Sequence, residues 1–184
     1  IDPDTHASFM ASTNNGAPDL GAYHTYDEAV ADMQAVHAAH PTLTSDLVSW
    51  GRSLEGRTIW AMLVSTTPTV LDDPNKPEVS LIGNHHAREL ITVEIPLDLL
   101  HTLTEQYGVS SEVTNIVNTM EVWIVPMVNP DGHVYVETTD ENWRKNRRDN
   151  GDGSFGVDLN RNYSYKWGID NIGSSGNTRS DTYR

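Results

Sequence analysis

The sequence has no cysteine, no long apolar run, and far fewer basic residues than acidic ones. Without cysteine the chain can form neither a disulfide scaffold nor a metal site built from thiolates. No apolar run approaches the roughly 20 residues that a membrane-spanning helix needs, so we expect no membrane partner. The 12 Lys and Arg residues against 26 Asp and Glu residues give a formal net charge of -14. Because this charge repels a nucleic-acid backbone, we expect no nucleic-acid partner either.

The composition is that of a globular protein of one ordinary domain. Hydrophobic residues make up 37% and charged residues 21% of the 184 positions. Residues 1–22 are rich in Ser, Asn, Asp, Gly and Pro and show no hydrophobic period. We therefore expect an extension or linker at 1–22 and a single folded domain at 23–184.

Helix and strand patterns alternate along this domain. Thr25 and Glu28 have the spacing of a capping box at the start of a helix that Pro41 ends. The expected helices lie at 25–40, at 89–106 and at 110–119, and Pro96 should either kink the second helix or leave one of its carbonyls unpaired. The expected strands lie at 48–50, 56–64, 78–83 and 122–128. A tight turn is expected at 54–56, and Asn129-Pro130-Asp131-Gly132 predicts another turn after the last strand.

This alternation predicts an α/β fold with a mixed, mostly parallel central sheet and helices on both faces. Such sheets bind ligands beyond the carboxyl ends of their strands. From Asp149 onward the chain is rich in Gly, Asn, Asp and Ser, which favours long loops that form a site.

His86 and Glu89 offer an imidazole and a carboxylate three residues apart, at the end of an expected strand. Zinc takes nitrogen and oxygen ligands, and its catalytic sites use three protein ligands with one open position. The same spacing also occurs in ordinary surface pairs, so by itself it leaves both interpretations open. We interpret His85 as structural, because its distance from Glu89 suits neighbours on one helix face.

Asp72 and Asp73 with Glu78 form a second acidic group before an expected strand. Clustered carboxylate oxygens suit calcium. A solvated acidic loop explains the same pattern, and Pro74 and Lys76 count against a calcium site.

Four motifs read in order give a more specific signal. They are Gly83-Asn84-His85-His86-Ala87-Arg88-Glu89, Asn129-Pro130-Asp131-Gly132, Trp143-Arg144-Lys145-Asn146-Arg147 and Val157-Asp158-Leu159-Asn160-Arg161-Asn162-Tyr163. Over residues 23–184 the chain resembles the zinc metallocarboxypeptidases of the carboxypeptidase A/B type. Its Tyr-His-Thr-Tyr-Asp start at 23–27 is most similar to the bacterial carboxypeptidase T branch, whose members also carry calcium.

The resemblance implies a role for each matching residue. His86 and Glu89 match the first two zinc ligands, and Asp158 matches the carboxylate that hydrogen-bonds a ligand histidine. Without the resemblance, Asp158 would be interpreted as a loop cap.

Substrate contacts are implied in the same way. Arg144 matches the arginine that polarises the scissile carbonyl, and Asn160 and Arg161 match the pair that receives the terminal carboxylate of the substrate. Arg88 matches a residue that contacts the substrate further upstream. Taken alone, Arg144 and Arg147 would be interpreted as part of a solvated basic face.

The chain departs from the family pattern near its end. The third zinc ligand of the family is a later histidine and its general base a later glutamate, yet no His follows His133 and no Glu follows Glu141. Neither His101 nor His133 lies at a matching position. We therefore expect an N-terminal portion of a peptidase catalytic domain, with the missing C-terminal part of the same domain as a partner.

The resemblance implies a secreted, extracellular metalloprotease that cleaves the last peptide bond of peptides or proteins with zinc-activated water. The isolated chain is expected to lack turnover. Two alternatives stay open: an inactive family member that binds peptide C-termini, and a cell-wall or γ-glutamyl peptidase relative.

Overall fold

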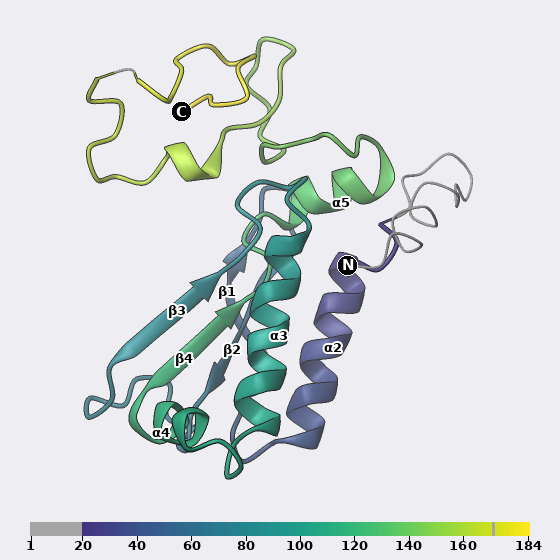
Figure 1. The fold of residues 1–184 in the computed structure, drawn as a ribbon. Coiled ribbons are helices and arrows are strands. Elements are labelled where there is room, and N and C mark those ends of the chain that lie inside the picture. Colours follow the sequence, from purple (N-terminus) through teal and green to yellow (C-terminus); the bar gives the residue numbers. More distant parts are fainter. Residues whose placement is uncertain (1–19, 171) are drawn as a thin grey trace.

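The computed structural model describes residues 20–170 and 172–184, and Figure 1 shows their arrangement. The helices are α2 (Tyr26–Ala39), α3 (Ile91–Glu105), α4 (Ser111–Thr119), α5 (Pro130–Thr138) and the short 3-10 helix η1 (Leu159–Arg161). The strands are β1 (Val48–Arg52), β2 (Thr58–Val64), β3 (Glu78–Ile82) and β4 (Glu121–Val125). The predicted extension lies almost wholly outside the described residues. The division at 22/23 stays a prediction, and Leu20 is buried in a small cluster with Ala87 and Val136.

Local signals set the beginning of α2 as expected. The Thr25 hydroxyl accepts a hydrogen bond from the Glu28 amide at 3.3 Å, and the Glu28 carboxylate accepts one from the Thr25 amide at 2.9 Å. This reciprocal pair satisfies two amide groups that a helix start leaves without partners. The helix ends at Ala39, before Pro41.

The four strands form one mixed sheet in the order β1-β2-β4-β3. β3 and β4 are parallel, whereas β1 pairs with β2 and β2 with β4 in the antiparallel sense. The α/β class and the mixed sheet are confirmed. The expectation of a mostly parallel sheet does not hold for the described residues, because a tight turn at Gly56, with φ 89°, joins β1 directly to β2. A two-strand hairpin of this kind is antiparallel.

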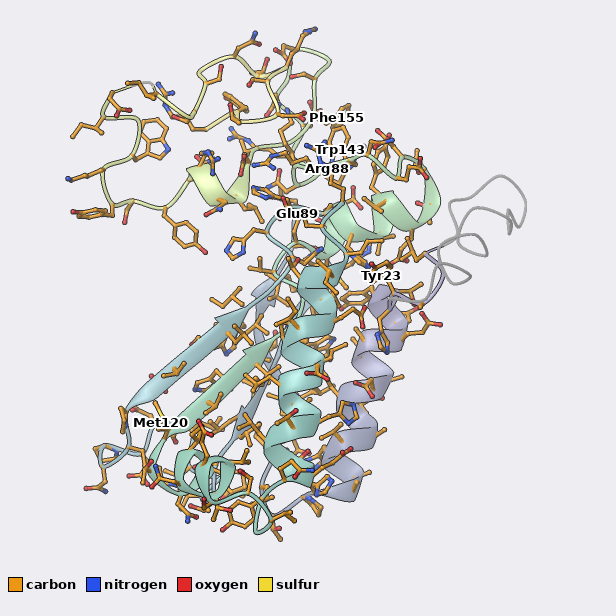
Figure 2. All side chains as sticks on the ribbon, viewed as in Figure 1. Tyr23, Arg88, Glu89, Met120, Trp143 and Phe155 are labelled. Carbon is orange, nitrogen blue, oxygen red and sulfur yellow. The ribbon has the colours of Figure 1, made fainter. Side chains whose placement is uncertain are left out.

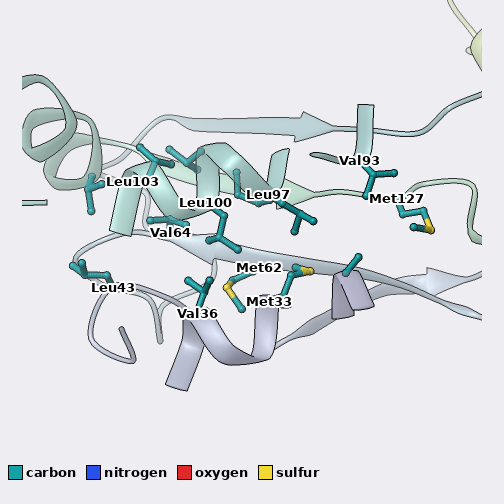
Figure 3. Close-up of a cluster of buried hydrophobic side chains, with 14 residues drawn as sticks. Met33, Val36, Leu43, Met62, Val64, Val93, Leu97, Leu100, Leu103 and Met127 are labelled. Carbon is teal, nitrogen blue, oxygen red and sulfur yellow. The ribbon is translucent and has the colours of Figure 1, made fainter. Parts of the chain in front are cut away.

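The main core lies between the helices and one face of the sheet (Figure 3). Met62 and Val64 of β2 and Ile124 of β4 pack there against side chains of α2, α3 and α4. Ala61, Leu63, Trp123 and Val125 form a separate cluster on the other face of the sheet. None of the described helices contributes to this second cluster, so in the described part of the chain helices cover one face of the sheet. The expectation of helices on both faces does not hold for these residues.

Gly83 lies where β3 meets the start of α3. Pro96 sits within α3 without ending it, and because proline has no N–H, the Thr92 carbonyl loses its usual helical partner. A Cβ at Gly83 would overlap that carbonyl oxygen and lie 2.6 Å from the carbonyl oxygen of Pro126. The motif that begins at Gly83 is therefore pressed closely against α3.

The predicted turn at Asn129-Pro130 is instead a helix start. The Asn129 side chain accepts a hydrogen bond from the Gly132 amide at 3.2 Å and caps α5, and Pro130 is its first residue. The prediction missed this because an Asn cap followed by Pro favours a turn and a helix N-terminus alike. Beyond α5 the chain is mainly loop, and in Figure 1 these loops gather beyond the carboxyl ends of β3 and β4.

Candidate metal centre and carboxylate-binding site

Asn84 shapes the loop that follows β3. Its φ of 55° is in the left-handed region, which Asn tolerates better than most residues. Its buried side-chain amide donates hydrogen bonds to the carbonyls of His86 and Ala87, at 3.4 and 3.3 Å. Its backbone N–H donates to the Thr92 hydroxyl at 3.1 Å. These bonds fold the loop back on itself before α3 begins.

This fold brings His86 and Glu89 together. Nδ1 of His86 lies 2.9 Å from Oε1 of Glu89, and both residues line a cavity of about 350 Å³. His86 is buried and Glu89 is exposed, and Figure 2 shows Glu89 beneath the loops that carry Trp143 and Phe155. A nitrogen and a carboxylate oxygen that converge on one cavity fit the donor set that zinc prefers.

His86 and Glu89 would supply two of the three protein ligands expected for catalytic zinc. Within residues 20–170 and 172–184, no three His, Cys, Asp or Glu side chains are grouped so that they could hold a metal ion. His101 lies beside Asp32 on the outside of α3, as expected for a surface residue, and His133 is buried in α5. Neither lines the cavity of His86 and Glu89.

Asp158 connects the separate parts of the site. Its fully buried carboxylate caps η1 by accepting a hydrogen bond from the Asn160 amide at 2.9 Å. The same oxygen, Oδ1, lies 2.9 Å from Nε2 of His86, while Oδ2 accepts bonds from Nε and Nη2 of Arg144 at 3.2 and 2.9 Å. The bond to Asp158 fixes the imidazole ring and leaves Nδ1 of His86 facing Glu89.

Arg144 lies beside the metal half-site, which is the pair His86 and Glu89. Its Nη1 lies 3.6 Å from Oε1 of Glu89, and its side chain is 13% exposed. The Arg144 carbonyl also accepts a hydrogen bond from the Ala87 amide at 3.0 Å, which joins the loop of Arg144 to the loop between β3 and α3. A held guanidinium beside a metal-ligand pair can stabilise an oxyanion that forms there.

Arg147 anchors the Arg144 loop from behind. Its guanidinium carbon lies 3.7 Å from the ring centroid of Tyr135, 4.7 Å from that of Trp143 and 4.9 Å from that of Phe155. Such cation–π contacts are strongest where water is excluded. Arg144 and Arg147 are therefore packed into the molecule and do not form the solvated face that they would suggest in isolation.

Asn160 joins the metal half-site to a second cavity. It lines the cavity of His86 and Glu89, and it also lines a neighbouring cavity of about 300 Å³ together with Arg161. The Arg161 side chain donates hydrogen bonds to the carbonyls of Gly173 and Asn160, at 2.7 and 2.9 Å. An amide and a guanidinium thus lie next to each other, and the amide also borders the cavity of His86 and Glu89.

Arg88 points elsewhere. Its guanidinium donates to the Asn142 carbonyl at 3.0 Å and pairs with the exposed Asp181 carboxylate at 3.4 Å. It lines neither of the two cavities, so the structure does not bring Arg88 together with the other predicted residues.

His85, which we interpreted from the sequence as structural, and Tyr163, to which the sequence gave no role, are two further residues of the site. Nε2 of His85 lies 2.5 Å from the Tyr163 hydroxyl, and His85 lines the same cavity as His86. Burial lowers the pKa of His85, and the neighbouring His86 lowers it further. The signals available in the sequence were the adjacent histidines and a tyrosine next to Asn-Arg-Asn.

The acidic group at 72–78 gives no support to the calcium expectation. Oδ1 of Asp73 accepts hydrogen bonds from the backbone and side chain of Asn75, at 3.0 and 2.9 Å. Oε1 of Glu78 accepts one from the Trp123 indole at 3.1 Å. These oxygens serve internal hydrogen bonds, and none of the described acidic residues here belongs to a group that could hold an ion.

Known proteins resemble this chain in sequence and in fold. The sequence profile of the Zinc carboxypeptidase family matches residues 29–184. The Zinc carboxypeptidase of Saccharothrix mutabilis subsp. capreolus is 41% identical over 148 residues, which are 79% of this chain and 33% of that protein. Metallocarboxypeptidase A of Trichophyton tonsurans is 38% identical over 181 residues, covering 96% of this chain and 42% of that protein.

The fold has matches among solved structures. The crystal structure of carboxypeptidase A from Helicoverpa armigera superimposes with a TM-score of 0.77 at 32% identity, over 97% of this chain and 42% of that chain. The chain therefore spans between 33% and 42% of the length of these relatives. None of the helices in the described part combines the length and apolar character that a membrane crossing requires. With the profile matching most of its length, this chain belongs to the zinc carboxypeptidase family.

Proposed function

We propose that the protein containing this chain is a zinc-dependent metallocarboxypeptidase that removes C-terminal residues from peptides or proteins. Residues 23–184 would be the N-terminal portion of its catalytic domain. One observation carries the proposal: the Asp158 carboxylate holds His86, Arg144 and the Asn160 amide at once. These contacts support one site in which metal binding, carbonyl polarisation and recognition of a chain end would occur together.

His86 and Glu89 would hold the zinc ion. The ion, when bound, acts as a Lewis acid and lowers the pKa of a coordinated water to about 7. Arg144 would stabilise the oxyanion that develops from the scissile carbonyl. Its Nε and Nη2 are held by Asp158, and its Nη1, which lies 3.6 Å from Oε1 of Glu89, would be the group that meets the carbonyl.

Asn160 and Arg161 would receive the free carboxylate of the last residue. A guanidinium matches a carboxylate with two parallel hydrogen bonds, and the amide adds a further donor. Since Asn160 borders both cavities, a carboxylate bound here leaves the last peptide bond close to His86 and Glu89. The third metal ligand and the general base would come from the C-terminal part of the domain.

A matched pair of substrates tests this proposal. The full-length protein should release the last residue from an N-blocked dipeptide with a free carboxylate, but not from the corresponding C-terminal amide. A chelator should abolish release, and zinc should restore it. Arg161→Met should lower kcat/KM about 10- to 100-fold, because hydrogen bonds to charged groups contribute about 1.5–3 kcal/mol.

Arg148→Met is the control, because Arg148 is an exposed member of the basic run and lines neither cavity. Its kcat/KM should match that of the wild type. Absence of release by the zinc-loaded protein would refute the enzyme. Equal cleavage of acid and amide would refute the role of Asn160 and Arg161.

A second candidate is a family member that binds peptide C-termini without cleaving them. The observation favouring it is that the described residues offer two metal ligands and not three. Binding of the free-carboxylate dipeptide without release of its last residue would select this candidate. Because Asn160 and Arg161 suit an α-carboxylate, a cell-wall or γ-glutamyl substrate fits less well. Extracellular location is proposed from the family resemblance alone.

A further inference from the structure

The two adjacent histidines each contact one end of the segment that carries Asn160 and Arg161. His86 contacts Asp158, where the segment begins, over 72 residues of sequence. His85 contacts Tyr163, where the segment ends, over 78 residues of sequence. Consecutive residues of one loop therefore hold both ends of a six-residue segment, 158–163, in the other loop.

Two points of attachment to the β3–α3 loop constrain the position of the segment more than one would. Its internal bonds run from the Arg161 amide to the Asp158 carbonyl at 3.0 Å, and from the Asn162 side chain to the same carbonyl at 2.8 Å. These bonds set the shape of the segment but not its orientation relative to the β3–α3 loop. The segment is also bonded to later loops, through Arg161 to the Gly173 carbonyl at 2.7 Å and through Asn162 to the Tyr183 carbonyl at 3.4 Å. The His85–Tyr163 contact adds a second bond between the segment and the β3–α3 loop, besides that of Asp158.

The contact also lies on the boundary between the two cavities. His85 lines the cavity of His86 and Glu89, Tyr163 lines the cavity of Arg161, and Asn160 lines both. The ring centroids of His85 and Tyr163 are 5.8 Å apart, and their planes are tilted by 46°. Tyr163 is 57% exposed, so a bond formed through its hydroxyl adds little burial. The contact therefore does more to orient the segment than to stabilise a core.

We propose that His85 and Tyr163 are positioning residues, which fix Asn160 and Arg161 for binding of the substrate carboxylate. This inference rests on the proposed function of that pair. Neither residue touches the carboxylate itself. Their hydrogen bond holds the carboxylate-binding segment in register with the metal half-site.

Steady-state kinetics of the full-length, zinc-loaded protein test the proposal. The substrates are an N-blocked dipeptide and its C-terminal amide, and any residual cleavage of the amide serves as a reference. Tyr163→Phe removes only the hydroxyl and should raise KM for the free acid about three- to tenfold, the range of an ordinary hydrogen bond. The value of kcat should change less than twofold, and neither zinc content nor residual amide cleavage should change.

Tyr107→Phe is the matched control, because it also removes a hydroxyl hydrogen bond, the one to Asn118 at 3.0 Å, but Tyr107 lines neither cavity. It should leave KM at the wild-type value. His85→Ala should raise KM as Tyr163→Phe does, and the double variant should show no further increase because both changes remove the same bond. Wild-type KM in Tyr163→Phe, an equal rise in Tyr107→Phe, or additive effects in the double variant would each overturn the proposal.

Arg161→Met separates this inference from the proposed function. If Arg161→Met weakens cleavage of the acid while Tyr163→Phe does not, the positioning role fails and the carboxylate-binding pair stands. If Arg161→Met leaves cleavage of the acid unchanged, the carboxylate-binding role of Arg161 fails, and the positioning role fails with it.

Discussion

Replacing Asp158 by Asn tests the connection on which the site depends. The two side chains have nearly the same shape, but Asn carries no charge, and an NH₂ group, which donates hydrogen bonds, replaces one of the two carboxylate oxygens of Asp. Asp158 accepts from donors on both oxygens, with His86 and the Asn160 amide on one side and Arg144 on the other. Either orientation of the Asn amide therefore places donor against donor.

Two consequences have a predictable size. Removing one partner of a buried ion pair costs about 3–5 kcal/mol, and we expect the lower end because the Arg144 side chain is 13% exposed and can regain some water. Losing the group that orients a metal-binding histidine weakens metal affinity about 10- to 100-fold. Asp158→Asn should therefore lower both the free energy of unfolding and the affinity for zinc.

Urea denaturation and zinc titration against a competing chelator, both on the full-length protein, provide the measurements. Asp181→Asn is the control, since that carboxylate is 64% exposed and lies 3.4 Å from Arg88. Its change in unfolding free energy should stay within about 0.5 kcal/mol. His86→Ala, which removes a proposed ligand, should abolish zinc binding in the same titration and shows that the assay reports on this site. If Asp158→Asn then binds zinc as tightly as the wild type, the reasoning is refuted.

Three further predictions concern stability. Gly83→Ala should destabilise the fold by about 2 kcal/mol or more through overlap with the Thr92 carbonyl, whereas Gly176→Ala, with open space around it, should change the urea midpoint little. Burial raises the pKa of Glu121, and nearby carboxylates including Asp73 raise it further. The protonated Glu121 side chain therefore stabilises the fold in acid, and this stabilisation is lost as the pH rises through the folded-state pKa. Glu121→Gln should therefore exceed the wild type in stability at pH 7, and the difference should vanish below about pH 4; equal midpoints at pH 7 would contradict this. Removing zinc should lower the melting temperature of the full-length protein in proportion to the lost binding energy, and a melting temperature independent of added zinc would count against a resident metal.

Much of the local structure was predictable because its causes lie within a few residues. The Thr25–Glu28 capping box, the turn at Gly56 and the apolar runs of β2 and β4 each act over short distances. The Asn129-Pro130 motif was misread for the same reason, since a turn and a helix start share these residues. The antiparallel pairing of β2 with β4 and the placement of helices on one face follow from long-range contacts, which periodicity does not reveal.

The sequence by itself determined the chemical inventory of the site: an imidazole, a carboxylate, guanidinium groups and an amide, in an order that resembles one enzyme family. Only the tertiary structure decided which of them meet. It placed Asp158 against His86 and Arg144, turned Arg88 toward Asp181, and brought Tyr163 to His85. The physical reason is that hydrogen bonds and ion pairs depend on distance in space. Packing of the β3–α3 loop against η1 sets that distance between residues more than 70 positions apart.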